Sequence, residues 1–572
     1  MFRADRGRGG AHWALPVRRW GPVVFAVVLA GAAIWRARYG IDFSDSSHAV
    51  ELALRMAQGD APFRDELNIQ VLGSWPAVPF VWVWTHVAGI DGLVLASRVF
   101  YVLLGLACGV ASWRAVAPHV GRGTAAAAIG VALIPAAYNQ QVVSYNTTPS
   151  MAYLLAVCAG AAAIGRRSLP WGVVSGAAVV LGAMSHPVTA PAAVALVVVL
   201  LLLARGRGLL GVGAGLAGTG IVVAVLALGV WGLANLRETL AFTDDYQSTR
   251  APREVRIDRW LTFLGGEMSQ PWAVAAFVLS GLAVLVWAVP ALRRARGVLV
   301  VAAVAAAGVQ AVLRGSSGST FSVASWLSPV LATVLLVVLL PTALASAVAR
   351  RGMTARVVAL GLLPTLVGMP FVAGFTSSAP IWGATGAVIA PGLFAVTVAT
   401  LAWVSEHGRV VKAAVALLLV AGLAFVHTAN SFRDGSPGHL TATVADGAYA
   451  GLRTTPERRE TIADNQLALS LCARPGDGVL AYIYPAAFLL GDVRFATPIT
   501  WLDFFGESNT HVLAWYGRTG RVPQCVVAAR AFWPGYGRTS YVREPDPLRS
   551  WVQSNYRVVT QTPEIVVLER RT

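Results

Sequence analysis

The sequence predicts a polytopic α-helical membrane protein of about thirteen spans, followed by a C-terminal external α/β domain. Hydrophobic residues make up 56% of the 572-residue chain and charged residues only 13%, whereas a soluble chain carries about a quarter charged residues. Basic residues fall in short clusters between long apolar runs, and the composition becomes polar after residue 430. These observations exclude a cytosolic globular enzyme.

The net charge of +17 comes from 45 Lys and Arg against 28 Asp and Glu. Such a basic chain could suggest a nucleic-acid partner. Residues 430–572 are nearly neutral, however, with 15 Arg and 13 acids, which leaves 30 basic and 15 acidic residues in the apolar part. The charge excess therefore belongs to membrane loops, and the lipid bilayer rather than a nucleic acid is the expected partner.

The hydrophobic runs are long enough for thirteen helical spans of about 20 residues each. With the amino terminus in the cytoplasm, the cytoplasmic segments contain 19 basic residues and only two acids, Asp5 and Glu406. This contrast follows the positive-inside rule and places the carboxyl terminus outside. The predicted spans begin near Pro22, Leu93, Thr124, Pro149, Leu169, Val188, Leu209, Trp272, Val298, Trp326, Val357, Trp382 and Val410.

Three regions follow from this topology: a cytoplasmic basic tail at 1–20, a multi-span domain at 21–429 and an extracytoplasmic α/β domain at 430–572. The first apolar run could also be a signal peptide, but we favour an uncleaved span. In the external domain three short apolar runs predict buried strands: Gly478–Tyr484, Cys525–Ala529 and Glu564–Leu568. Its two cysteines, Cys472 and Cys525, could form a disulfide in this compartment, although their spacing does not show one.

The first external loop, residues 36–75, carries the acids that could do chemistry. Its apolar pattern over Ser47–Gln58 predicts a short helix lying along the membrane surface, broken by Gly59–Pro62. Asp45 would start this helix, where the helix dipole favours a carboxylate. An acid held there can serve as general base toward an acceptor hydroxyl, or it can simply cap the helix.

The layout resembles the GT-C superfamily of membrane glycosyltransferases, which have many spans, an acidic first external loop and an exported C-terminal domain. The stretch Asp45–Glu66 and the later Ser144-Tyr-Asn-Thr147 carry the resemblance. It implies transfer of a hexosyl or pentosyl group from a polyprenyl-phosphate donor to a lipid, glycan or protein acceptor. Asp45 matches the family's catalytic acid, but Ser46 stands where related enzymes often have a second acid. Asp42 is the second candidate for the base.

Arginine suits a donor phosphate because its paired N–H groups fit phosphate oxygens. The candidates are Arg98, Arg314, Arg55 and Arg64. Arg98 lies within a predicted span, where a charge costs ~2.5–3.5 kcal/mol and usually faces a cavity or a partner. The predicted substrate-binding side chains are His48, Asp65, Glu66, Tyr145, Asn146 and His186.

Cofactor use stays open, because Asp45 with Asp65 or Glu66 could hold a divalent cation although no metal motif is present. The sequence favours an inverting transferase at the outer face. A flippase of lipid-linked intermediates would place polar residues at mid-membrane depth, whereas the spans here are mostly Ala, Val, Leu and Gly. A non-catalytic scaffold is the third hypothesis, and none of the residues argues against it.

Overall fold

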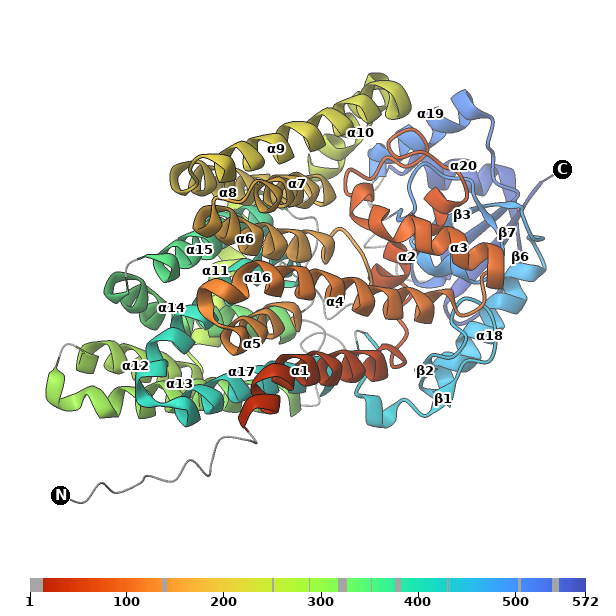
Figure 1. The fold of residues 1–572 in the computed structure, drawn as a ribbon. Helices are drawn as coiled ribbons and strands as arrows, with labels where there is room; N and C mark the ends of the chain where they lie inside the picture. Colours follow the sequence, from red (N-terminus) through yellow and green to blue (C-terminus); the bar gives the residue numbers. More distant parts are fainter. Residues whose placement is uncertain are drawn as a thin grey trace, which may run out of the picture.

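A computed structural model gives the fold of the chain. It describes residues 14–135, 141–248, 251–287, 289–316, 327–350, 352–375, 382–429, 431, 433–502, 506–536 and 545–571. Figure 1 shows the long helices gathered on one side of the molecule and the sheet on the other, with α2 (Asp45–Ala57) and α3 (Val78–Ala88) on the side of the sheet. The predicted fold class, a helical membrane part with a C-terminal α/β domain, is confirmed.

The helices of the membrane part follow the apolar runs of the sequence. They are α1 (Ala14–Ala37), α4 (Leu93–Val120), α5 (Arg122–Leu133), α6 (Thr148–Arg166), α7 (Leu169–Ser185), α8 (Ala190–Leu203), α9 (Arg207–Leu226), α10 (Leu233–Ser248), α11 (Arg253–Met268), α12 (Pro271–Trp287), α13 (Arg293–Ser316), α14 (Leu327–Ala349), α15 (Met353–Phe375), α16 (Trp382–Val404) and α17 (Arg409–Ala429).

The thirteen predicted spans all fall on helices, but their lengths differ. Within the described residues, seven helices are long and apolar enough to cross a membrane, or eight if the bent pair α11 and α12 counts as one span. Five shorter apolar helices, in α1, α5, α7, α8 and α13, account for the other predicted spans. Each predicted span thus lies on a helix, and the number of helices that cross the membrane stays a prediction.

The first external loop folds into α2 (Asp45–Ala57), a 3-10 turn (Val71–Ala77) and α3 (Val78–Ala88). The helix begins at Asp45, as the sequence predicts, and ends before Gly59, which has a φ of +101°. Residues 45–56 are all buried, because α2 packs into a hydrophobic cluster with the external domain. The predicted helix is therefore present and is covered by the domain, while its position along the membrane surface stays a prediction.

The C-terminal domain, called the external domain here after its predicted location, contains a five-stranded mixed sheet in the order β4-β3-β5-β7-β6. Strands β3 (Gly478–Tyr482), β4 (Arg494–Phe495) and β5 (Cys525–Ala529) are parallel, whereas β7 (Ile565–Arg570) and β6 (Tyr556–Gln561) are antiparallel additions. Its helices are α18 (Pro456–Ser470), α19 (Thr510–Thr519) and α20 (Pro547–Asn555), and a separate two-stranded ladder joins β1 (Ala442–Thr443) to β2 (Arg453–Thr454). The three predicted strands are confirmed as β3, β5 and β7.

A disulfide between Cys472 and Cys525 ties the end of α18 to the start of β5. It closes a loop over a sequence separation of 53 residues. Disulfides persist in oxidising compartments and are rare in the cytosol. The bond is therefore consistent with an external location for this domain.

Candidate active site

The first turn of α2 is held by Asp42 rather than by Asp45. One Asp42 carboxylate oxygen accepts from the Ser44 backbone N–H at 3.1 Å and the other from the Ser46 N–H at 2.7 Å. The Ser44 hydroxyl also donates to Asp42, at 2.7 Å. These are the bonds that satisfy the open N–H groups of a helix start. Asp42 therefore caps the start of α2, and Asp45 is the first residue of the helix.

Asp45 forms an ion pair with Arg433, whose Nη2 lies 2.9 Å from the Asp45 carboxylate. Arg433 comes from the segment after α17 and also contacts the Ser44 hydroxyl. Among the four acids predicted for the site, Asp45 is the most exposed at 8%, against 1–3% for Asp42, Asp65 and Glu66. Arg433 belongs to no motif of the sequence, and its place among the first basic residues after the last predicted span is the signal that could have indicated it.

Arg98 binds the end of the first membrane helix. Its Nη1 donates to the Ala37 carbonyl at 3.1 Å and to the Tyr39 carbonyl at 3.3 Å. Arg36 donates to the same Tyr39 carbonyl, at 2.8 Å. Both side chains thus satisfy carbonyl groups that a helix C-terminus leaves open. Arg98 is buried at 6% exposure and pairs with protein groups rather than pointing to solvent.

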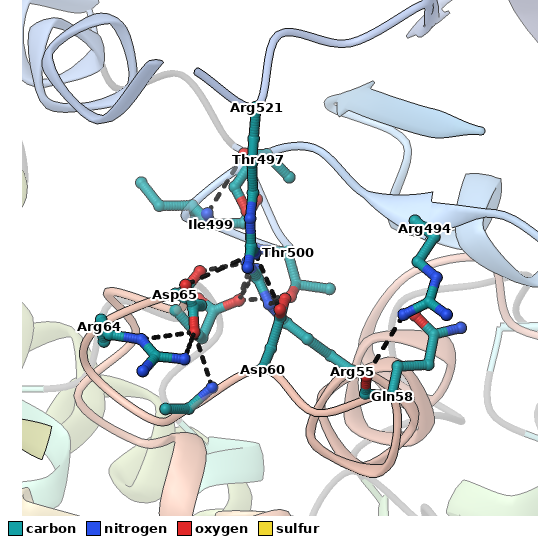
Figure 2. Close-up of polar contacts among 12 residues, drawn as sticks. Arg55, Gln58, Asp60, Arg64, Asp65, Arg494, Thr497, Ile499, Thr500 and Arg521 are labelled. Carbon is teal, nitrogen blue, oxygen red and sulfur yellow. Dashed lines mark hydrogen bonds and ion pairs between the residues drawn. The ribbon is translucent and has the colours of Figure 1, made fainter. Parts of the chain in front are cut away.

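Arg55 joins the first loop to the external domain (Figure 2). Its guanidinium donates to Asp60 and Glu66, each at 2.8 Å, and to the carbonyls of Asp65 and Thr497. Glu66 in turn accepts from the backbone N–H and the hydroxyl of Thr500. Burial raises the pKa of Glu66, although Arg55 and Thr500 oppose that shift. Arg55, predicted to bind the donor phosphate, and Glu66, predicted to bind substrate, therefore make a buried connection between two parts of the chain.

Asp65 is held mainly by charge pairs at the edge of this network. It accepts from Arg64 at 2.7 Å and from the Ala61 backbone N–H at 2.8 Å, and Arg521 lies 3.5 Å from its other oxygen. Burial alone would raise the pKa of Asp65, but these partners hold it below its usual value. Arg64 keeps a half-exposed side chain. Arg314 lies near the end of α13, and its side chain is outside the described residues.

Three segments that are far apart in the sequence bring His48, Tyr145 and His186 together. The Tyr145 ring lies 6.1 Å from the His48 ring and 5.8 Å from the His186 ring, in edge-on contacts. Trp501 of the external domain lies 5.3 Å from His48. Burial lowers the pKa of His48 to about 3 and that of His186 to about 4. Both imidazoles are therefore neutral at physiological pH.

Carboxamide and hydroxyl groups complete this cluster. Asn68 lies 3.2 Å from His48 Nε2, and Gln70 lies 3.3 Å from His186 Nε2. Asn146 is buried next to Tyr145, and its backbone N–H donates to the Ser144 hydroxyl at 3.2 Å. Gly73 permits the close approach, because a Cβ there would lie 2.2 Å from Tyr145 Cα. Neutral aromatic and amide groups of this kind suit an uncharged polyhydroxyl ligand.

Glu51, on the same helix as Asp45 and His48, is a further acid that the sequence analysis did not single out. It is fully buried, and neither carboxylate oxygen has a hydrogen-bond partner among the described residues. Burial raises its pKa well above the usual value, and the charges of Asp42 and Glu66 raise it further. Glu51 also raises the pKa of Tyr449, whose hydroxyl lies 2.7 Å from the Ser47 hydroxyl. Burial and these neighbouring charges therefore favour the protonated form of Glu51.

A proton held by Glu51 makes the stability of the folded protein depend on pH. We expect the substitution Glu51→Gln to remove this dependence. The folded state keeps this proton after the unfolded state has lost it near pH 4.5, so wild-type stability falls as pH rises toward the folded pKa. Linkage sets the slope at up to about 1.4 kcal/mol per pH unit. We expect the variant to gain stability relative to wild type between pH 5 and pH 8 in thermal unfolding. A stability difference that stays constant over this range would contradict a protonated Glu51.

The described residues contain no group of three or more His, Cys, Asp or Glu side chains placed to hold a metal ion. The proposed cation ligands Asp65 and Glu66 are instead paired with arginines. Asp45 likewise has Arg433 as its charge partner. In the described part of the chain, these carboxylates paired with arginines are suited to hydrogen bonding and proton transfer.

No protein-family model and no curated protein matches the sequence. Among solved structures, the chain is similar to the crystal structure of ArnT from Cupriavidus metallidurans in the apo state. The sequences are 14% identical, the match covers 96% of this chain and 98% of that chain, and the TM-score is 0.38. A likeness of this degree carries no argument about the activity of this chain.

Proposed function

We propose that the chain is a GT-C-type, inverting glycosyltransferase of the cell membrane. It moves a hexosyl or pentosyl group from a polyprenyl-phosphate donor to a hydroxyl of a lipid, glycan or protein acceptor. The observation that carries this proposal is the position of Asp45. It starts a helix between the membrane part and the external domain and is the most exposed of the predicted acids, beside Arg433.

In the proposed reaction Asp45 takes the proton from the acceptor hydroxyl. The hydroxyl oxygen then attacks the anomeric carbon, and the bond from that carbon to the phosphate oxygen breaks. The polyprenyl phosphate leaves with the bonding electron pair and needs no protonation. General base catalysis of this kind contributes ~10²–10⁴ in rate.

Arg433 is the best-placed cation for the departing phosphate, because its guanidinium already lies at the proposed base. Arg64 is the next candidate, with half of its side chain exposed. Arg55 and Arg98 remain weaker candidates because protein acceptors already occupy their donors. The cluster of His48, Tyr145 and His186 is proposed to bind sugar hydroxyls, together with Asn146.

The stereochemistry tests the mechanism. Single displacement inverts the anomeric centre, so the product should have the opposite anomeric configuration to the donor. Purified protein is incubated with polyprenyl-phosphate sugars and cell-envelope acceptors, and the linkage of the product is determined by NMR. Retained configuration would count against a single displacement. A flippase or a scaffold would give no product at all.

The proposed reaction also requires that the external domain lie on the outer side of the membrane. The positive charges of the predicted cytoplasmic segments and the Cys472–Cys525 disulfide both support this orientation. Reporter fusions after Arg351 and after Ser431 should report cytoplasm and exterior, respectively. A Ser431 fusion in the cytoplasm would overturn both the orientation and the proposed site.

A further inference from the structure

Two arginines from different helices converge on Glu406, which lies in the turn Ser405–His407 between α16 and α17. One Glu406 oxygen lies 2.5 Å from Arg296 Nη2, near the start of α13. The other lies 3.1 Å from Nη2 of Arg350, which follows the end of α14. Figure 1 shows α13 and α14 toward the end of the helical part that is farthest from the sheet. This cluster is therefore separate from the candidate active site.

The positive charge of the cluster exceeds what Glu406 neutralises. Lys412, in the first turn of α17, is partly buried, and the positive charge of Arg350 acts on its ammonium group. That ammonium group forms no ion pair or hydrogen bond with any residue that the structure describes. The three cations and one carboxylate together leave a net charge of +2. Like charges held close together at a partly buried place repel each other, and a bound anion would relieve that repulsion.

Exposed apolar side chains lie beside each of the three cations. Val298 of α13 is 69% exposed, Val348 of α14 is 72% exposed and Val410 of α17 is 83% exposed. Each valine lies two residues along the chain from one of the cations. Both α14 and α17 are apolar and long enough to cross a membrane, and cations near the ends of such helices lie at the level of the lipid headgroups. A ligand of this cluster is therefore expected to combine a negative charge with an apolar part.

We propose that the cluster binds the phosphate group of an anionic phospholipid. Arg350 and Lys412 hold the phosphate, and the acyl chains lie against the exposed valines. Arg296 is only 1% exposed, so it supports the site through Glu406 and does not touch the lipid. A zwitterionic phospholipid carries an ammonium group beside its phosphate, and the net positive charge of the cluster repels that group. The inference concerns lipid binding and does not rest on the proposed transfer reaction.

Photocrosslinking in lipid nanodiscs tests this site. The full-length protein is reconstituted in phosphatidylcholine with a small fraction of a lipid that has a diazirine in its acyl chain, either phosphatidylglycerol or phosphatidylcholine. Each Lys or Arg beside an anionic lipid contributes ~5-fold in binding. We therefore expect adducts on the peptides around Val348 and Val410 that are at least ~10-fold more abundant with the phosphatidylglycerol probe. Equal labelling by the two probes would overturn the proposal.

Inorganic phosphate distinguishes a lipid site from a site for a free anion. An excess of inorganic phosphate should leave the phosphatidylglycerol adducts in place, because it lacks the apolar part that the exposed valines contact. Sodium chloride at the same ionic strength is the control for screening. Loss of the adducts with inorganic phosphate, but not with sodium chloride, would mean that the cluster takes free phosphate and would overturn the lipid assignment.

Charge-removing variants locate the phosphate. Arg350→Gln and Lys412→Gln should each lower the phosphatidylglycerol adducts ~5-fold, and the double variant should bring them to the phosphatidylcholine level. Lys412→Arg keeps the charge and should keep the preference. Arg205→Gln is the matched control, because Arg205 is an exposed cation between α8 and α9 with no ion pair in the described part of the chain. An undiminished preference in the double variant, or an equal loss in Arg205→Gln, would overturn the proposed site.

Discussion

Asp45→Asn is expected to lower turnover by ~10²-fold or more while the protein still folds. Asparagine keeps the size of the side chain but cannot accept the proton of an acceptor hydroxyl. The start of α2 should survive, because Asp42 makes its capping hydrogen bonds. The lost ion pair with Arg433 involves a side chain that is 29% exposed, so its cost should be at most about 1 kcal/mol. Turnover is measured with the donor and acceptor identified by the transfer assay.

Asp42→Asn is the matched control for this prediction. Both Asp42 oxygens accept backbone N–H groups, and an amide can replace only one of them. This variant should therefore lose stability in thermal unfolding and lose less turnover than Asp45→Asn. Near-normal transfer by Asp45→Asn together with an inactive, folded Asp42→Asn would make Asp42 the base. Full activity of both variants would move the catalytic centre out of the first loop.

The membrane part was predictable because its signal is local. Apolar runs and basic clusters place every span on a helix, and the alternation of apolar and turn residues locates β3, β5 and β7. The capping role of Asp42 was not predictable, because it depends on the irregular backbone before α2, including Gly40 at a φ of +86°. Sequence spacing carries no signal for such a turn.

The way in which the predicted site residues come together could not be read from the sequence either. His48, Tyr145 and His186 were selected separately, and the structure joins them because Gly73 lets the Tyr145 segment approach. Glu51 carries no motif in the sequence, and its complete burial appears only in the fold, where α2 packs against the C-terminal domain. Arg433 reaches Asp45 from beyond the last membrane helix. Both depend on contacts between distant segments, which neither periodicity nor composition encodes.

Arg55→Met is expected to destabilise the docking of the first loop on the external domain by about 3–5 kcal/mol, the usual cost of breaking a buried ion pair. Arg55 is fully buried, and its removal leaves the 1%-exposed Glu66 carboxylate without its cation. Methionine fills much of the same volume, so packing changes little. Thermal unfolding of the purified full-length protein and limited proteolysis between residues 57 and 75 measure the loss.

Arg64→Met is the control that shows how much of the effect of Arg55→Met comes from burial of the ion pair. Arg64 also pairs with an acid, the neighbouring Asp65, but its side chain is 50% exposed. Water already stabilises much of that guanidinium, so the expected cost is only about 0–1 kcal/mol. Adding Glu66→Gln to Arg55→Met should recover part of the lost stability, since it removes the uncompensated charge. If Arg55→Met unfolded no earlier than Arg64→Met, the connection between loop and domain would rest on hydrophobic packing, and the network of Figure 2 would not be what holds α2 in place.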